Sequence, residues 1–204
     1  ADFHTTDGTV IGPFSSSIIG LTPFTPYYYR AYATNSIGTD YGAEYTFMTL
    51  PAGPGPYPIS SLNELRWLSE NSSYWNSDFV QTADIDAGDT QNWDGGGFSP
   101  IGNDNISFTG SYDGQGYKIV GLYIERNYYV GLFGIISGEV SNVGIENADI
   151  RGEYYVGGLV GKNSSIITNS YSTGSVSGGE IVGGLVGKNS GHSTIINSYS
   201  TGSV

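Results

Sequence analysis

The stretch VGGLVGKNS occupies Val156–Ser164 and returns unchanged at Val182–Ser190. A shorter copy, VGLFG, occupies Val130–Gly134, so the copies start at Val130, Val156 and Val182, a constant step of 26. Self-similarity at a fixed period of about 20–50 residues is typical of repeat proteins, in which each unit stacks on the next. A period of 26 is too short for a β-propeller blade, which takes about 40 residues, so the repeat predicts a solenoid.

The residues between the copies predict short strands. Apolar runs of a few residues alternate with Gly, Asn, Ser and Asp, and no helical spacing occurs after residue 71. Three short strands and their turns would close one rung of a parallel β-helix in about 26 residues. We therefore predict an all-β parallel β-helix over residues 59–204. Because the chain stops inside a repeat, we expect it to be a fragment of a larger polypeptide, truncated at the C-terminal end of the stack.

Aligning the repeats predicts columns of equivalent side chains. Asparagines recur at nearly the step of the glycine-rich copies, and we expect them to form a hydrogen-bonded ladder that also caps turns. Leucines recur in a second column and are expected to fill the interior, while the glycines are expected at corners, where φ is positive or the wall bends tightly. The ladder residues are Asn142, Asn169 and Asn197, and the leucines are Leu132, Leu159 and Leu185. The alignment also places Tyr117 in the column of Val140 and Ile167.

A short helix is predicted just before the repeats. Ser61 and Glu64 have the spacing of a capping box, and Leu62, Leu65 and Leu68 follow helical periodicity. We predict a helix at about residues 61–71. It would cover the open N-terminal end of the stack, where an uncapped solenoid exposes its core and strand edges.

The part of the chain before the repeats has a different pattern. Tyrosines and alanines alternate through YYYRAYATNS at Tyr27–Ser36, and a turn leads to a second alternating run, so a hairpin is predicted, with a preceding strand at SSSIIGL (Ser15–Leu21). Residues 51–58, PAGPGPYP, contain four prolines and are predicted to be a stiff linker. The predicted domains are therefore residues 1–50, the linker, and residues 59–204.

Composition excludes several classes of function. The chain of 204 residues has a net charge of −12 with only seven basic residues, which argues against binding to nucleic acid or to an anionic membrane surface. It has no cysteine, so neither a disulfide framework nor a thiolate metal site can form. It has no apolar run long enough to span a membrane, so no membrane insertion is expected in this fragment.

Tyrosine pairs are the candidate binding residues. Tyr128–Tyr129 and Tyr154–Tyr155 occupy equivalent repeat positions, and strand alternation predicts that one ring of each pair points outward. Exposed stacked tyrosines can bind sugar rings or protein partners. The alternative interpretation is ladder packing along the wall, without a ligand.

An acidic loop is the candidate metal site. Asp84, Asp86 and Asp89 offer oxygen ligands at a spacing that calcium could use, although the loop departs from the EF-hand pattern. We expect no other cofactor, and any calcium to bind weakly. The alternative interpretation is a hydrogen-bonded turn or a solvated acidic loop.

No catalytic motif is found in the sequence. GGLVGKNS lacks the spacing of a phosphate-binding loop, His-Glu-x-x-His is absent, and His4 and His192 have no acidic neighbour in sequence. The sparse basic residues do not suggest a polysaccharide lyase. We therefore predict that this fragment is not an enzyme, and that any catalytic domain lies outside it.

Two resemblances sharpen this interpretation. GLTPFTPYYYRAYATNSIGTDYG (Gly20–Gly42) resembles the C-terminal strand pair of a fibronectin type III domain, over about residues 18–49. The VGLFG and VGGLVG copies resemble the GLUG motif, a Gly-Leu-x-Gly repeat of bacterial surface and secreted proteins, over about residues 59–204. That resemblance implies a right-handed β-helix, an extracellular or cell-surface location, and a place in adhesin-like proteins or the non-catalytic parts of immunoglobulin A peptidases.

The expected function is a non-catalytic adhesion, binding or display module of a bacterial surface protein. Its partners would be a glycan or a host or cell-surface protein, and the open end of the stack could associate end to end with another copy. The alternatives are a substrate-positioning region of a secreted peptidase or polysaccharide-degrading enzyme, and a structural spacer.

Overall fold

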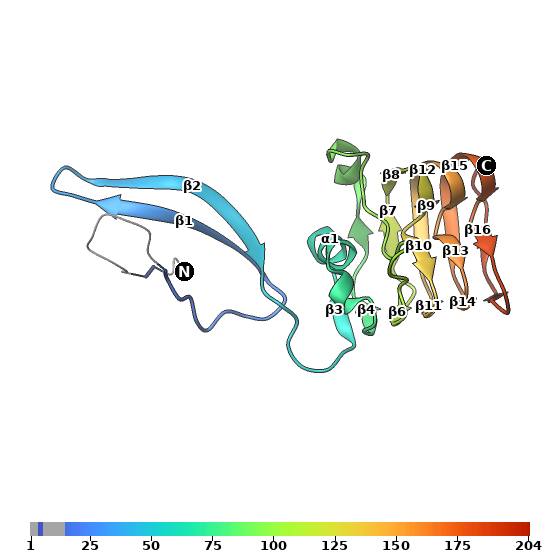
Figure 1. Cartoon of the computed structure of the whole chain (residues 1–204), viewed down its shortest axis with the longest axis horizontal. Coiled ribbons are helices and arrows are strands. Elements are labelled where there is room, and N and C mark those ends of the chain that lie inside the picture. Colours follow the sequence, from blue (N-terminus) through green and yellow to red (C-terminus); the bar gives the residue numbers. More distant parts are fainter. Residues whose placement is uncertain (1–3, 6–14) are drawn as a thin grey trace. The chain divides into compact units, whose positions relative to one another are not determined.

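The computed structural model in Figure 1 describes residues 4–5 and 15–204, and it divides the chain into two units, residues 1–53 and 54–204. The first unit contains an antiparallel hairpin of β1 (Pro26–Thr34) and β2 (Thr39–Met48). Aromatic rings pair across it, for example Tyr29 with Tyr45 at 5.6 Å between centroids. The hairpin prediction is confirmed, but residues 15–25 form no strand, so the predicted preceding strand is wrong.

The second unit is built from three parallel sheets (Figure 1). One sheet has the order β10 (Phe133–Ile136), β13 (Val160–Asn163), β16 (Val186–Asn189). Another has the order β17 (Thr194–Ile196), β14 (Ile166–Thr168), β11 (Glu139–Ser141), β6 (Ser111–Asp113), β4 (Phe79–Gln81), β3 (Tyr57–Ile59).

The third sheet contains the longest strands. Its order is β18 (Tyr199–Ser200), β15 (Tyr171–Gly183), β12 (Gly144–Gly157), β7 (Lys118–Val120), β5 (Ile85–Asp86). Two further strands, β8 (Tyr123–Glu125) and β9 (Tyr128–Val130), also pair with β12. Each later repeat thus adds one strand to every sheet, which confirms the all-β prediction and the parallel pairing.

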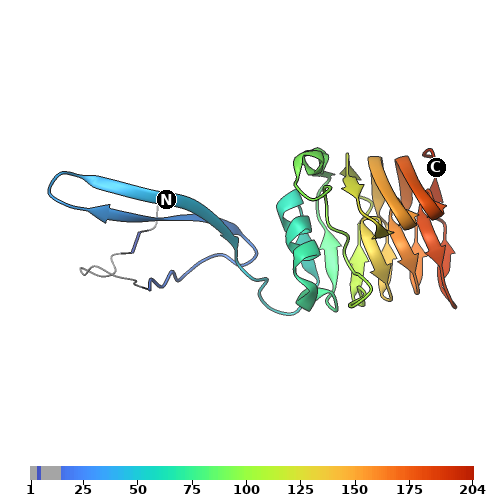
Figure 2. The same ribbon diagram turned by 45° about the horizontal axis from the view of Figure 1, so that its top comes forward.

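The pairing register follows the sequence repeat. Lys162 pairs with Lys188 and Tyr128 with Tyr154, both at the step of the glycine-rich copies, while Val140 pairs with Ile167 at a step longer by one. Figure 2 shows the strands of successive repeats side by side along the stack. Equivalent residues of successive repeats therefore lie directly above one another.

Apolar side chains from the three sheets fill the interior. Leu132 and Leu159 are fully buried and Leu185 is 8% exposed, as the leucine column requires. Nearer the N-terminal end the core is aromatic, with Phe108 at 5.2 Å from Phe133. Burying side chains of this size stabilises the fold by about 1.5–3 kcal/mol each, so the leucine and aromatic columns are a main source of stability.

Tyr112, rather than Tyr117, occupies the column of Val140. The predicted position of Tyr117 is wrong because the turn around Gln115 and Gly116, both with positive φ, adds residues that the later repeats lack. Tyr112 is fully buried, its hydroxyl bonds to the side-chain oxygen of Gln81 at 3.2 Å, and burial raises its pKa.

The predicted helix is confirmed as α1 (Leu62–Glu70) and lies at the end of the stack that begins with β3 (Figure 1). Ser61 is its N-cap and accepts a hydrogen bond from the Glu64 backbone N–H at 3.4 Å, while the Glu64 carboxylate accepts from the Ser60 N–H at 2.6 Å. Leu65 and Leu68 are fully buried. Two 3₁₀ turns, η1 (Ser72–Tyr74) and η2 (Gly88–Asn92), follow.

The boundary of the predicted linker needs correction. Residues 51–58 were predicted to be a stiff linker, but Tyr57 and Pro58 belong to β3 and pair with Phe79 and Val80 of β4. Pro58 is compatible with this because β3 is the edge strand of its sheet, where a missing N–H breaks no inner ladder.

Most glycines of the repeats lie where the chain packs too closely for a side chain, and their φ is not positive. A Cβ at Gly157 would lie 2.3 Å from the Val160 carbonyl oxygen, and one at Gly161 would lie 2.7 Å from that of Tyr155. The left-handed corner positions in the repeats are taken instead by Tyr129, Tyr155 and other non-glycine residues. Of the two roles expected for these glycines, positive φ is therefore not the one at Gly157 and Gly161, where the closely approaching backbone leaves no room for a Cβ.

Candidate functional site

Two pairs of tyrosine rings stack on each other between the neighbouring strands β9 and β12. The rings of Tyr128 and Tyr154 lie 5.2 Å apart and 8° from parallel, and those of Tyr129 and Tyr155 lie 5.1 Å apart and 3° from parallel. The parallel pairing of Tyr128 with Tyr154 places like rings one above the other. We call these four residues the tyrosine ladder.

A corner in the backbone lets neighbouring tyrosines both reach the surface. Tyr129 has φ of 53° and Tyr155 has φ of 58°, which interrupts the alternation of a regular strand. Tyr128 is 57% exposed and the other three rings are half-buried. The expectation that only one ring of each pair is accessible therefore needs correction. The ladder consists of two stacked pairs of accessible rings, and Lys188 Nζ lies 5.3 Å from the Tyr155 ring centroid.

The asparagine column forms a hydrogen-bonded ladder. Asn169 Nδ2 donates to Asn142 Oδ1 at 3.2 Å, and Asn197 Nδ2 donates to Asn169 Oδ1 at 3.3 Å. All three residues have φ between 49° and 54°, a conformation that asparagine tolerates better than most side chains. The structure thus brings together the residues that the repeat spacing predicted.

The asparagine ladder begins at the carboxylate of Asp113, which the repeat spacing did not predict. Asn142 Nδ2 donates to Asp113 Oδ1 at 2.8 Å. Burial opposes ionisation of Asp113, but hydrogen bonds from Asn142 and from the Gln115 backbone N–H and side chain outweigh it, so the pKa of Asp113 is lowered. The negative charge orients the first amide and, through it, those that follow.

A second polar column links three repeats on the third sheet. Lys118 Nζ lies 2.9 Å from Glu146 Oε1, which also accepts a hydrogen bond from the Tyr171 hydroxyl at 2.7 Å. These hydrogen bonds lower the pKa of Glu146 and raise that of Lys118. Partial burial and the bond to Glu146 raise the pKa of Tyr171 to about 12. These contacts link neighbouring strands of the third sheet. The repeat spacing did not predict them, because the three residues are of different types and therefore do not form a recurring pattern.

The acidic loop does not converge on a metal site. The Asp84 carboxylate accepts from the Lys118 backbone N–H at 2.9 Å, and that of Asp86 accepts from the Gly88 N–H at 2.9 Å. In residues 4–5 and 15–204, no group of three or more His, Cys, Asp or Glu side chains could hold a metal ion. The structure thus gives Asp84, Asp86 and Asp89 no shared coordination geometry, and it matches the alternative, a hydrogen-bonded turn.

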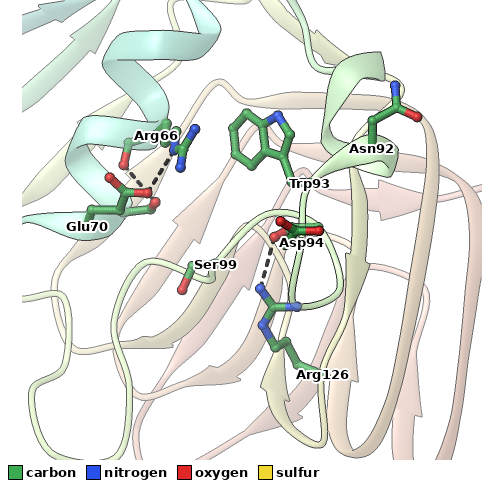
Figure 3. Close-up of a pocket in the computed structure, with 9 residues that line it drawn as sticks. Arg66, Glu70, Asn92, Trp93, Asp94, Ser99 and Arg126 are labelled. Carbon is green, nitrogen blue, oxygen red and sulfur yellow. Dashed lines mark hydrogen bonds and ion pairs between the residues drawn. The ribbon is translucent and has the colours of Figure 1, made fainter. Parts of the chain in front are cut away.

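An open groove lies between α1, the loop after η2 and the turn before β9 (Figure 3). Its two parts measure about 400 and 960 Å³ and share Ser69, Glu70, Ser99 and Arg126. Arg66 pairs with Glu70 at 2.8 Å, and its guanidinium carbon lies 4.6 Å from the centroid of the Trp93 ring. The larger part reaches Tyr128 and Tyr129, so the groove adjoins the first rings of the tyrosine ladder. No sequence motif marked it, since its walls are far apart in the chain.

Within the part of the chain that the structure describes, no helix is long and apolar enough to cross a membrane.

A family model described as the GLUG motif matches residues 152–177 and 178–204. The chain is 39% identical to halomucin of Haloquadratum walsbyi over 151 residues, which cover 69% of this chain and 2% of halomucin. It is 35% identical over 102 residues to a protein of Evansella cellulosilytica named as a Gly-rich membrane protein, which cover 45% of this chain and 11% of that one. The chain therefore spans only a small part of either relative.

Among solved structures, the chain is similar to a protein described as an immunoglobulin A1 protease from Bacteroides ovatus, with a TM-score of 0.38 and 18% identity. The match covers 72% of this chain and 67% of that one. A TM-score this low does not indicate a common fold, so nothing about this chain follows from it. The two GLUG matches follow each other at the same step that sets the strand register, so the motif corresponds to one repeat of the stack.

Proposed function

We propose that residues 54–204 are a parallel β-helix solenoid that serves as a non-catalytic binding module of an extracellular or cell-surface protein. The GLUG matches and the names of two relatives, a halomucin and a Gly-rich membrane protein, support a surface setting. In the same proposal, the β1–β2 hairpin is the C-terminal part of a fibronectin type III-like domain, as the resemblance of Gly20–Gly42 implies.

The tyrosine ladder is the observation that carries the proposal. Four stacked, accessible rings form a rigid amphipathic surface, with apolar faces for contact and hydroxyl groups for hydrogen bonds. Rings held in register by strand pairing lose little conformational entropy when they bind a partner. Binding would then depend on contact area rather than on a single reactive group.

The test is a binding screen of the full chain against a glycan array and an array of cell-surface proteins. We expect binding that weakens about tenfold on Tyr154→Ala or Tyr155→Ala, because each removes an aromatic contact and its buried area. Tyr199→Ala is the matched control, since Tyr199 stacks on Tyr171 at 5.5 Å outside the ladder. Binding that is unaffected by both ladder variants, or no binding at all, would contradict the proposal and favour a spacer.

A further inference from the structure

The two parts of the groove described above lie within one unit and share four lining residues. Both of its parts are lined by the exposed face of α1, the loop of residues 92–104 and the turn at residues 125–129, all within residues 54–204. Figure 3 shows the α1 side chains and the loop side chains on opposite sides of it, with Arg126 below the loop. Clefts of a few hundred cubic ångströms are the usual size of small-ligand sites.

The Tyr128 ring is accessible to solvent and lines this groove. Tyr154 stacks on one face of the ring, and among the described residues no second aromatic ring stacks on Tyr128. The ring is 57% exposed and lines the larger part of the groove. Since stacking on Tyr154 holds it in place, Tyr128 forms a rigid platform on which the apolar face of a ligand ring can pack.

Arg126 supplies fixed hydrogen-bond donors in the centre of the groove. Its Nη2 donates to the Gly97 carbonyl at 2.9 Å and its Nη1 to the Glu125 carbonyl at 2.8 Å. These bonds use two of the five N–H donors of the guanidinium group. Partial burial lowers the pKa of Arg126, and no ion pair with a carboxylate is found for it among the described residues.

The remaining polar side chains of the groove are carboxylates, which accept, and amide and hydroxyl groups, which both donate and accept. Asp94 and Asp104 are exposed carboxylates on the loop. The groove holds four carboxylates against two guanidinium groups, and the whole chain carries −12, which disfavours an anionic ligand. The central guanidinium disfavours a cationic one. Sugar hydroxyls, which both donate and accept, suit a site that mixes acidic acceptors with a fixed donor and an aromatic platform.

We infer that this groove binds a neutral oligosaccharide, with one sugar ring packed on the exposed ring of Tyr128 and its hydroxyl groups bonded to Arg126, Asp94 and Asp104. The inference rests on the proposed function in treating the unit as a binding module. It adds the chemical class of the ligand, and it places the ligand beside the N-terminal end of the tyrosine ladder.

The experiment is calorimetric titration of the full chain with three neutral tetrasaccharides: cellotetraose, mannotetraose and β-1,4-galactotetraose. Tetragalacturonate and tetralysine are the anionic and cationic comparators. We expect at least one neutral sugar to bind. Tyr128→Ala should weaken it about tenfold, and Asp104→Asn about fivefold, because the first removes the platform and the second weakens a charge-assisted acceptor without altering the exposed loop. Tyr199→Ala should change the affinity by less than about twofold, since Tyr199 stacks on Tyr171 and lines neither part of the groove.

Several outcomes would overturn the inference. These are binding of none of the neutral sugars, binding of tetragalacturonate or tetralysine alone, or neutral-sugar binding that neither Tyr128→Ala nor Asp104→Asn weakens. Binding lost equally in Tyr128→Ala and Tyr154→Ala but unchanged in Asp104→Asn would place the sugar on the ladder face instead. In that case the groove inference fails while the proposed function stands. Circular dichroism spectra that match the unmodified chain ensure that a loss reports on binding and not on folding.

Discussion

Asn169 lies in the middle of the asparagine ladder and tests how much that ladder stabilises the fold. It donates one side-chain hydrogen bond and accepts another, at 3.2 and 3.3 Å, and its φ of 49° is in the left-handed region. Asn169→Ala removes both side-chain hydrogen bonds. It also places alanine in the left-handed region, which alanine tolerates less well than asparagine does. Asn169→Gly removes the same two bonds but suits the backbone.

The expected magnitude follows from these two parts. Each bond is neutral, long and exposed, so we assign it about 0.5 kcal/mol, the lower end of the usual range. Holding alanine at positive φ costs about 1 kcal/mol more than holding asparagine there. Asn169→Ala should therefore lower the free energy of unfolding by about 2 kcal/mol, and Asn169→Gly by about 1 kcal/mol. For a chain of this size the alanine variant should melt about 4–8 °C lower.

Urea unfolding of the full chain measures this directly. All three tryptophans, Trp67, Trp75 and Trp93, lie in residues 54–204, so their fluorescence reports on that unit alone. Far-UV circular dichroism on the same samples tests whether unfolding is a single transition. An alanine variant within about 0.5 kcal/mol of the unmodified chain, or a glycine variant less stable than the alanine variant, would refute the reasoning.

Three further predictions concern close packing, pH and calcium. Gly161→Ala should destabilise the chain by about 1–3 kcal/mol in urea unfolding, because its Cβ would lie 2.7 Å from the Tyr155 carbonyl oxygen, and a loss below about 0.5 kcal/mol would contradict the packing argument. Asp113 has a lowered pKa when folded, so its stabilisation is present above the unfolded pKa near 3.9 and is lost as pH falls through the folded value. Asp113→Asn should thus be less stable than the unmodified chain at pH 7, with a difference that shrinks below about pH 4, and a difference of constant size in melts across that range would exclude the carboxylate as the origin of the ladder. Because the acidic loop lacks a shared coordination geometry, we expect millimolar calcium or chelator to leave the melting temperature unchanged, and a reproducible rise with calcium would restore the calcium hypothesis.

The repeat period made most of the second unit predictable. Equivalent residues of successive repeats had to stack once the strands were parallel, so the leucine column and the ladder of Asn142, Asn169 and Asn197 could be read from spacing alone. The capping helix was predictable for a local reason, since Ser61 and Glu64 make their bonds within one turn.

Features that depend on where the repeat is broken could not be read in this way. The turn at Gln115 and Gly116 shifts the register, so Tyr112 replaced Tyr117 in its column and Asp113 became the start of the ladder. The role of the repeat glycines was also not predictable. The sequence shows that they lack a side chain, but only the structure shows which backbone atoms pack against them.

The sequence by itself determined the architecture of this chain: its period, its parallel stacking, its interior columns and its N-terminal helix, because each depends on local patterns that repeat. Only the tertiary structure decided which distant side chains meet. It left Tyr128 57% exposed, it gave the three carboxylates of the acidic loop no shared coordination geometry, and it brought α1, the loop of residues 92–104 and the turn at Arg126 together around one groove. These segments lie in parts of the chain that do not repeat. Tertiary packing alone brings them together, so the repeat period could not predict the groove.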